Sequence, residues 1–204
     1  MPRVVDKEAK KMQILQVAMK VFARKGVVKT KMIDIATEAG IGKGTIYEYF
    51  RSKEEIFASA FTYFFETMMG EINQAIHAEH DPVRQLQIIT ELSLKSLIEG
   101  NAEFADIMMD FWAEGVRNKN QVMLSSINLK GIYADYRKIV AKILKSGINQ
   151  GIFKKMDINA AASVFIGTFD GIMLQWILDR KIVNLHKVLS ILMDTFINGI
   201  KIEN

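Results

Sequence analysis

Hydrophobic positions recur at intervals of three and four along almost the whole chain, which is the period of an α-helix. The stretch from Phe57 to Ile76 is the clearest case, because one apolar face continues through about five turns. No segment alternates apolar and polar residues over a useful length, and no turn dipeptide marks a β-hairpin. The pattern predicts an all-α fold of about nine helices with short connections.

Capping residues mark where several of these helices begin. Ser52 and Glu55 have the spacing of a capping box, which predicts a helix from residue 53. Asp81, followed by a proline, predicts the start of another helix. Asp157 is a candidate cap for a helix that is apolar almost all round over residues 160–178, which predicts burial on more than one side.

Composition is typical of a globular protein. The chain has 204 residues, of which 50% are hydrophobic and 25% charged, so a packed core is expected and disorder is not. The absence of cysteine excludes disulfides and cysteine-ligated metals. We find no signal peptide and no apolar run clean enough to span a bilayer, so we expect a soluble, cytoplasmic protein with no membrane partner.

Positive charge is concentrated at the start of the chain. Residues 1–55 carry 12 Lys and Arg against 7 Asp and Glu, whereas residues 56–204 carry 15 against 16. This asymmetry indicates that the first quarter of the chain meets a polyanion.

Catalytic patterns are missing. There is no Gly-x-Ser-x-Gly elbow for a serine hydrolase. His77 and His80 are spaced as metal ligands could be, but they stand at the polar end of a predicted helix, where histidine suits the dipole. The glycine run at residues 40–45 lacks the order of a phosphate-binding loop, and no strand precedes it. We therefore expect no enzymatic activity, no cofactor and no metal site.

The same glycine run fits a helix-turn-helix. Ala36, Gly40 and Ile46 have the spacing at which a small residue, a left-handed turn and a branched apolar residue let two short helices cross. Thr30 is the expected cap of the first helix, over residues 31–39, and the second helix is expected over residues 43–50. Ile46 and Phe50 then point inward, and a small, polar and basic tip remains outside. Such a tip suits phosphates and base edges.

The stretch from Ile14 to Phe57, and most tightly residues 33–56, resembles the DNA-binding domain of the TetR family of bacterial transcriptional repressors. The resemblance implies a helix-turn-helix DNA-binding domain over residues 1–52 and a helical ligand-binding and dimerisation domain over residues 53–204. It implies a homodimer that binds double-stranded operator DNA at a palindrome and is released by a small apolar or amphipathic effector. The alternative is a helical lipid- or small-molecule-binding protein, or an enzyme, that uses an aromatic cavity.

The resemblance also implies roles for individual residues of the first domain. Glu48 departs from many relatives, and a carboxylate near phosphate is costly unless it accepts a bond from cytosine N4. Either Glu48 reads a base or it faces away, and we favour the second. The expected DNA-binding residues are Thr30, Lys31, Lys43, Gly44, Thr45, Tyr47, Tyr49 and Lys53.

Candidate residues of the second domain are aromatic, methionine or small residues on its apolar helices. Asp170 is included because an unpaired charge in an apolar helix is expensive. It is expected to pair across a dimer, cap a helix or face a cationic ligand. The candidate ligand-binding residues are Phe61, Phe65, Met68, Met69, Met108, Phe111, Trp112, Tyr136, Phe169, Asp170, Met173 and Trp176. The candidate dimer residues, on the last two helices, are Phe165, Gly167, Gly171, Leu189, Met193 and Phe196.

Overall fold

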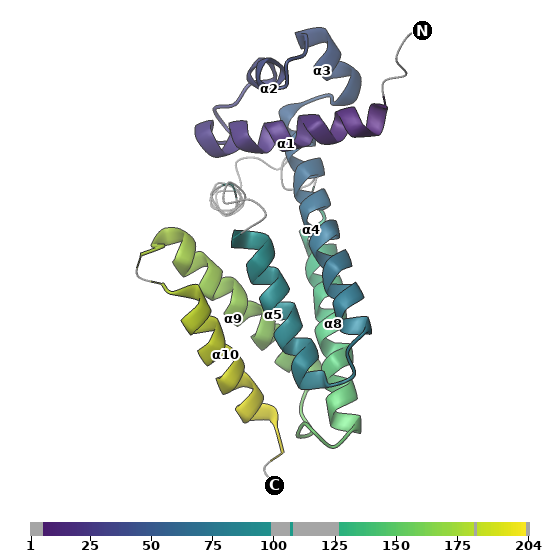
Figure 1. The fold of residues 1–204 in the computed structure, drawn as a ribbon, viewed down its shortest axis with the longest axis vertical. Helices are drawn as coiled ribbons and strands as arrows, with labels where there is room; N and C mark the ends of the chain where they lie inside the picture. Colours follow the sequence, from purple (N-terminus) through teal and green to yellow (C-terminus); the bar gives the residue numbers. More distant parts are fainter. Residues whose placement is uncertain (1–5, 99–106, 108–126, 182, 203–204) are drawn as a thin grey trace. The chain divides into compact units, whose positions relative to one another are not determined.

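The computed structural model describes residues 6–98, 107, 127–181 and 183–202, and these residues form eight helices (Figure 1). The expectation of an all-α fold is confirmed. The helices are α1 (Lys7–Lys25), α2 (Met32–Glu38), α3 (Lys43–Tyr49), α4 (Lys53–His77), α5 (Pro82–Ile98), α8 (Leu129–Asn149), α9 (Ile158–Leu178) and α10 (Leu185–Ile200).

The chain divides into two compact units. The first contains residues up to Glu66, together with Ile107, Ile127 and Asn128 among the described residues. The second contains residues 67–98 and 129–202. The division falls inside α4, because α4 is one uninterrupted helix that contributes to both units. From the sequence we placed the domain boundary before Lys53.

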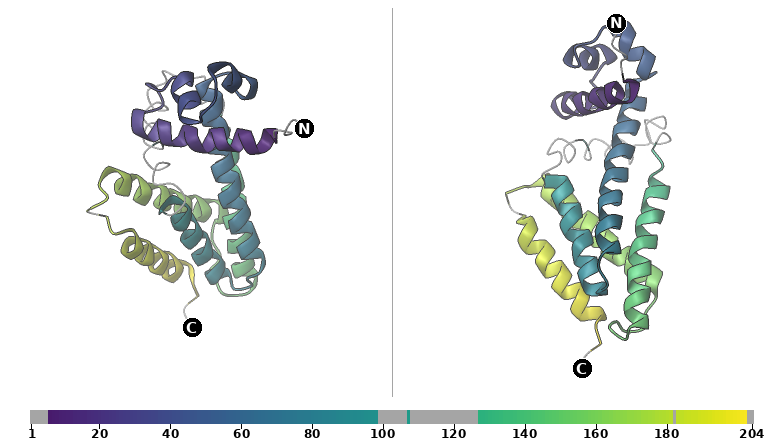
Figure 2. Two further views of the ribbon diagram at one scale, coloured as in Figure 1. Left: turned by 45° about the horizontal axis from the view of Figure 1, so that its top comes forward. Right: turned by 45° about the vertical axis from the view of Figure 1, so that its right-hand side comes forward.

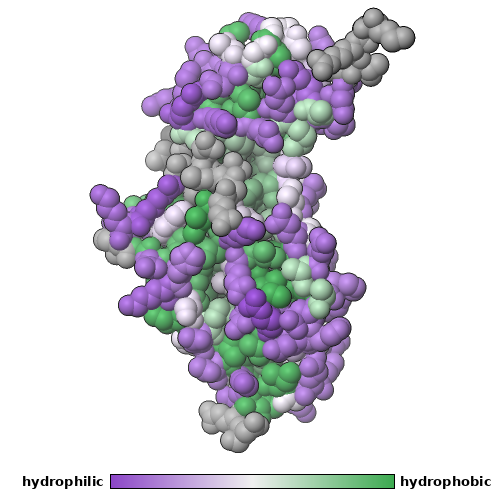
Figure 3. All heavy atoms as spheres, in the orientation of Figure 1, coloured by the Kyte–Doolittle hydropathy of each residue, from purple (hydrophilic) through white to green (hydrophobic). Residues whose placement is uncertain are grey.

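The first unit packs α1, α2, α3 and the start of α4 around one apolar core. The rings of Phe22 and Phe57 meet edge to face, with centroids 5.8 Å apart, and neither ring is exposed. Asp6 caps α1, since its side chain accepts the N–H groups of Glu8 and Ala9. Hydrophilic residues cover much of the viewed face of this unit in Figure 3.

The second unit is built from the end of α4 and from α5, α8, α9 and α10. Helix α8 packs against α5 and α9, and α10 packs against α9 and α5 (Figures 1 and 2). The caps expected from the sequence are present: Asp81 accepts the N–H of Val83, and Asp157 accepts the N–H groups of Asn159 and Ala160. The short segment after α8 pairs with the end of the chain through an antiparallel bridge between Phe153 and Lys201.

Gly147, inside α8, lies directly under the buried ring of Phe153. The chain turns back after α8 at Gly151, whose φ is +71°, and the amides of Ile152 and Phe153 both donate to the Gly147 carbonyl, at 2.9 and 3.1 Å. A β-carbon on Gly147 would overlap atoms of the Phe153 ring. The close approach therefore requires glycine at this position.

We expect Gly147→Ala to lower the free energy of unfolding by about 1–3 kcal/mol, because the added methyl overpacks a filled site. The matched control is Gly70→Ala in α4, where an added β-carbon meets no atom within 4 Å. That change should raise the free energy of unfolding by about 0.5–1 kcal/mol. Urea unfolding followed by circular dichroism measures both, and two variants of equal stability would contradict the packing described for Phe153.

Candidate nucleic-acid interface

The turn between α2 and α3 has the geometry that the sequence predicted. Gly40 has φ +63°, the left-handed conformation that glycine adopts without cost, and the N–H of Ile41 reaches back to the Ala36 carbonyl at 3.0 Å. Ala36 and Ile46 are both fully buried, so the small residue and the branched residue meet inside as expected. The helix-turn-helix is confirmed, with α2 and α3 each slightly shorter than the ranges expected from the sequence.

Helix α3 buries one side and leaves the opposite side open. Ile46 and Phe50 are 0% and 1% exposed. Residues follow one another by about 100° around a helix, so Gly44 and Glu48 both lie about 160° from Ile46. Both are exposed, and a β-carbon on Gly44 would meet nothing within 4 Å. Glu48 therefore lies in the middle of the open face of α3, and the expectation that it faces away from DNA stays a prediction.

Other candidates of α3 flank this face. Lys43, the first residue of the helix, is exposed, and Thr45 and Tyr49 are half-buried. Tyr47 is 48% exposed. Two tyrosines, a lysine and a hydroxyl therefore surround a glycine at which backbone can approach another molecule closely.

Thr30 does not cap α2, which corrects the sequence expectation. It is 2% exposed, and both its N–H and its hydroxyl donate to the Gly26 carbonyl, at 3.2 and 2.8 Å. The N-cap is Lys31, whose N–H donates to Asp34 at 2.9 Å. The Lys25 ammonium, 2.9 Å from Asp34, is the main cause that holds the pKa of that carboxyl below its usual value. Both hydrogen-bond donors of Thr30 are thus engaged inside the protein, whereas the Lys31 side chain remains exposed.

Lys53 holds the first unit together. Its ammonium donates to the carbonyls of Val27 and Val28 at 2.8 and 2.6 Å, which ties the start of α4 to the turn after α1. An ammonium has three protons, so one donor remains for a further acceptor. This structural role was missed, because the partners lie 25 and 26 residues away along the chain.

The candidate ligand-binding residues fall into both units. Phe61 and Phe65 belong to the first unit, where their rings stack with centroids 4.8 Å apart. Met68 and Met69 belong to the second unit, where Met68 is buried and Met69 half-buried. The remaining candidates Met108, Phe111 and Trp112 lie outside the described residues.

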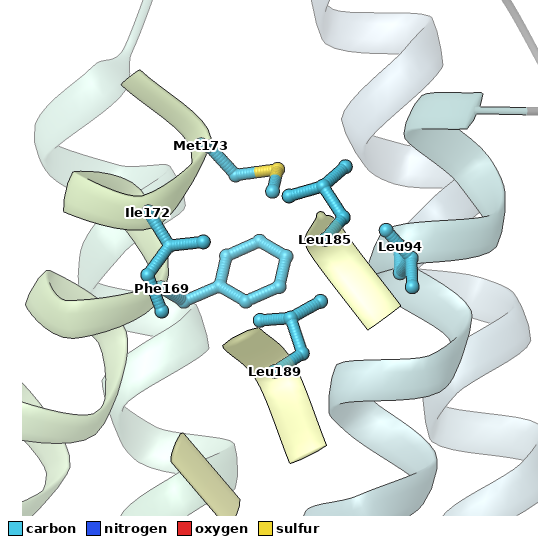
Figure 4. Packing of buried hydrophobic residues seen from close by; sticks show 6 residues of the cluster. All are labelled: Leu94, Phe169, Ile172, Met173, Leu185 and Leu189. Carbon is cyan, nitrogen blue, oxygen red and sulfur yellow. The ribbon is translucent and has the colours of Figure 1, made fainter. Parts of the chain in front are cut away.

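Phe169 and Met173 pack in the core of the second unit, and their expected contact with a ligand stays a prediction. Figure 4 shows Phe169 between Met173 and the leucines of α10. Both residues are 7% exposed. Trp176 packs against the edge of this cluster and is covered by the guanidinium of Arg180, 4.9 Å from the ring centre. The buried cluster consists of Leu94, Phe169, Ile172, Met173, Leu185 and Leu189.

Asp170 has a partner inside the protomer. The hydroxyl of Tyr133 donates to its carboxylate at 2.8 Å. Tyr136, buried beside them, lies 3.4 Å from the hydroxyl of Ser93, and its burial raises the pKa of its own hydroxyl to about 12. Burial is the main cause that raises the pKa of Asp170 above its usual value, and the bond from Tyr133 opposes that rise.

The raised pKa of Asp170 predicts a pH dependence of stability. The folded protein holds this proton more tightly than the unfolded chain, so stability falls as pH rises from the unfolded value, near 4, to the folded one. We expect Asp170→Asn to stabilise the protein at pH 7, with a gain that shrinks towards pH 4. Each unit of raised pKa corresponds to about 1.4 kcal/mol.

Urea unfolding midpoints at pH 4.5 and pH 7 measure this effect. Asp194→Asn is the control, because Asp194 is exposed on α10. A wild-type protein and an Asp170→Asn protein with the same pH dependence would show that Asp170 is not destabilised by its surroundings.

Three of the expected dimer residues are buried in the protomer. Phe165, Leu189 and Met193 are 1%, 3% and 7% exposed, so little of their surface is open to a second copy. Phe196 is half-buried, because its ring packs on Phe165 with centroids 5.1 Å apart. Gly167 remains exposed, and Gly171 remains half-exposed. The assignment of these residues to the dimer interface stays a prediction.

The structure instead leaves an apolar stripe open on α9. Val164, Leu174 and Leu178 are 58%, 43% and 67% exposed. Together with Ala160, Gly167 and Gly171, these residues follow one another at alternating intervals of four and three residues. That is the heptad spacing of helices that pack along each other. Glycines in the middle of such a stripe let two helices approach closely. We call it the α9 stripe, and it consists of Ala160, Val164, Gly167, Gly171, Leu174 and Leu178.

Helix α9 is also long and apolar enough to cross a membrane by composition alone, which corrects the sequence expectation that no run qualifies. The mean hydropathy of its most apolar 18 residues is 1.5, and 33% of them are buried inside the protomer. A helix with one side in the core and a second apolar side at the surface passes the same test. It is the single helix in the described part of the chain that passes.

Two segments of the chain match families of known proteins. Residues 14–60 match the tetR family of bacterial regulatory proteins, and residues 82–198 match the C-terminal domain of BetI-type transcriptional repressors. The fatty acid metabolism regulator protein of Bacillus subtilis is 29% identical over 202 residues, which are 96% of this chain and 97% of that protein.

Solved structures agree with these matches. The structure of FadR from Bacillus subtilis in complex with stearoyl-CoA is 25% identical and has a TM-score of 0.78, covering 92% of this chain and 98% of that one. The ketosteroid regulator KstR2 of Mycobacterium tuberculosis, at 23% identity and a TM-score of 0.69 over 95% of each chain, shares the fold. These relatives are regulators, so the alternative of an enzyme or carrier is not supported. The chain belongs to the tetR family and is a ligand-responsive, DNA-binding transcriptional repressor that acts as a homodimer.

Proposed function

We propose that this repressor inserts the open face of α3 into the major groove at each half of a palindromic operator, and that a fatty acyl-CoA releases it. The observation that carries the choice of effector is the match to the fatty acid metabolism regulator, which extends over 97% of that protein and so includes its effector-binding part. A structure of that kind of regulator holds stearoyl-CoA. The proposed site of action is the cytoplasm, where acyl-CoA and the operator are both present.

The charge and shape of the first unit support the DNA contact. Lys31 and Lys43 are exposed at the first turns of α2 and α3, where phosphate oxygens are favoured by the helix dipole and the free N–H groups. Tyr47 and Tyr49 flank the open face, and the remaining proton of Lys53 can reach one phosphate more. Thr30 is left out of the proposed interface, because its donors are engaged with Gly26.

A fatty acyl-CoA has a long apolar chain and several phosphates, and the second unit has apolar helices and a basic groove that suit these two parts. Its helices are rich in methionine and aromatic residues, which adapt to an apolar chain. Coenzyme A carries phosphates, and an open groove between α8 and α9 is lined by Arg137, Lys138, Lys142 and Lys145. Lys138 also bonds Asp135 at 2.9 Å, so its charge is partly offset.

Release requires that the effector binds two conformations with different affinity. Helix α4 belongs to both units without a break, from Lys53 at the turn after α1 to His77 in the second unit. Met68 and Met69 stand on α4, the helix whose first residue is bonded to the turn after α1. A ligand that displaces these two side chains therefore acts on a helix that is also part of the first unit. An effector must favour the released state by about 5.5 kcal/mol to move the population from 1:99 to 99:1.

The experiment that tests this function follows binding of the purified protein to a labelled duplex from upstream of its own gene by fluorescence anisotropy. Palmitoyl-CoA is then added, with coenzyme A alone and palmitate alone as controls. We expect tight binding that palmitoyl-CoA abolishes at concentrations at which neither control acts. Binding that no acyl-CoA reverses would overturn the proposed effector, and release by palmitate alone would identify the free acid instead.

A further inference from the structure

Glu48 is the one acidic side chain in the middle of the open face of α3. It lies about 160° around the helix from Ile46, the residue of α3 that is completely buried. Gly44, one turn earlier on the same face, has no side chain that could cover the carboxylate. Any molecule that lies against this face therefore meets Glu48.

The other carboxylates near the turn of the helix-turn-helix form ion pairs or hydrogen bonds inside the first unit. Asp34 bonds the ammonium of Lys25, Glu38 bonds the guanidinium of Arg24 at 2.7 Å, and Glu55 accepts the N–H of Arg51 at 2.7 Å. Within the part of the chain that the structure describes, Glu48 has neither an ion pair nor a hydrogen bond. Its charge is thus not neutralised by the protein, and its position is not explained by the stability of the fold.

A carboxylate that enters DNA unpaired is repelled by the phosphates on both sides of the groove. In the major groove it can be offset by an exposed amino group of a base edge. The cytosine N4 amino group has an acceptor on one side only, the O6 of its paired guanine, whereas the adenine N6 amino group lies between two acceptors, its own N7 and the O4 of the paired thymine, which repel a carboxylate. Cytosine is therefore the base that suits a carboxylate best.

We infer that Glu48 selects a cytosine in each half of the operator by accepting a hydrogen bond from its N4 amino group. The inference rests on the proposed function, because it requires that the open face of α3 enters the major groove. Lys43 and Tyr47 then position the helix on the backbone, and Glu48 supplies sequence information. The carboxylate also weakens binding to DNA that lacks the cytosine, so a single residue serves both attraction and rejection.

Selection from a library of random duplexes, followed by anisotropy titrations on single-base variants, tests this role. The wild-type protein should select a palindrome with a C·G pair at one symmetric position and lose about 10-fold in affinity per half-site when that pair is changed. Glu48→Ala should be indifferent at that position and keep its preferences elsewhere. Glu48→Gln should move the preference towards A·T, because an amide pairs with adenine N6 and N7.

Removing the Glu48 carboxylate should raise the affinity for unrelated DNA, although it removes the preference for cytosine in the palindrome. Glu48→Ala should bind a duplex without the palindrome more tightly than the wild type, since a negative charge has been removed from between phosphates. The matched control is Glu66→Ala, which removes the same charge from an exposed position of the first unit about 20 Å along α4 from its first residue. That control should leave every base preference unchanged.

Two results separate this inference from the function on which it rests. A Glu48→Ala protein that selects the same palindrome with the same discrimination at every position would overturn the role of Glu48 and leave the repressor function intact. A wild-type protein that selects no sequence from the library would overturn both. Circular dichroism of each variant shows that the fold is retained, as expected for an exposed residue.

Discussion

We expect the exchange Leu174→Glu to convert the homodimer into folded monomers that bind the operator at least 100-fold more weakly. Leu174 belongs to the α9 stripe and is 43% exposed in the protomer, so the protomer itself tolerates a charge there. Against a second copy of the stripe, two buried and unpaired carboxylates cost about 3–5 kcal/mol each. A single DNA-binding domain that binds alone also loses the 10²–10⁴-fold gain in affinity that a linked second domain provides.

Light scattering measures the mass, and anisotropy with the operator duplex measures affinity. Gln175→Glu is the matched control: it adds the same charge to the next, exposed residue of α9, which lies outside the α9 stripe. A charge at the rim of an interface costs little, so this variant should remain a dimer. If Leu174→Glu gives a dimer that binds the operator normally, the α9 stripe is not the interface.

The second large effect is expected at Gly44. Leucine at this position should abolish detectable operator binding, because its side chain occupies the space through which α3 approaches the groove. The fold should not suffer, since an added β-carbon meets no atom within 4 Å. Leucine is in fact about 0.8–1 kcal/mol better than glycine inside a helix.

Gly70→Leu serves as the control, because Gly70 is exposed in α4 and equally free of neighbours. It should bind the operator as the wild type does. Thermal unfolding of both variants shows whether each is at least as stable as the parent. A Gly44→Leu protein with undiminished affinity would mean that another surface contacts the DNA.

The helix-turn-helix could be predicted from sequence because its determinants are local. Ala36, Gly40 and Ile46 lie within eleven residues, and each has a residue type that few other structures require at that spacing. The left-handed Gly40 and the buried Ile46 follow from sterics alone. Helix ends such as Asp81 and Asp157 were predicted for the same reason, since a cap and its helix are neighbours in the chain.

The exposed side of α9 could not be predicted, because α9 is apolar on more than one side. Periodicity identifies an apolar face only where the other faces are polar. In α9, Phe165 faces the core and the neighbouring Val164 faces out, and nothing in their chemistry distinguishes them. The heptad spacing of the α9 stripe was present in the sequence, but an equally apolar set of core positions ran beside it.

Contacts between distant segments were beyond the sequence for a different reason. Lys53 meets the carbonyls of Val27 and Val28 only because α4 returns to the turn after α1. The hydrogen bond from Tyr133 in α8 to Asp170 in α9 joins residues 37 positions apart. It gives the aspartate a partner within the protomer, so neither a helix cap nor a ligand is needed to explain its charge. Such pairs follow from the tertiary fold rather than from spacing.

In the proposed complex, two copies of α3 enter the major groove on one face of a palindromic DNA. Hydroxyl-radical footprinting of the homodimer on the selected palindrome, combined with interference by methylation of guanine N7, tests it most directly, since N7 lies in the major groove. The account predicts two symmetric sites of interference about 10 base pairs apart, or a multiple of that distance, on one face of the duplex. Interference at a single site, or protection without any dependence on N7, would contradict it.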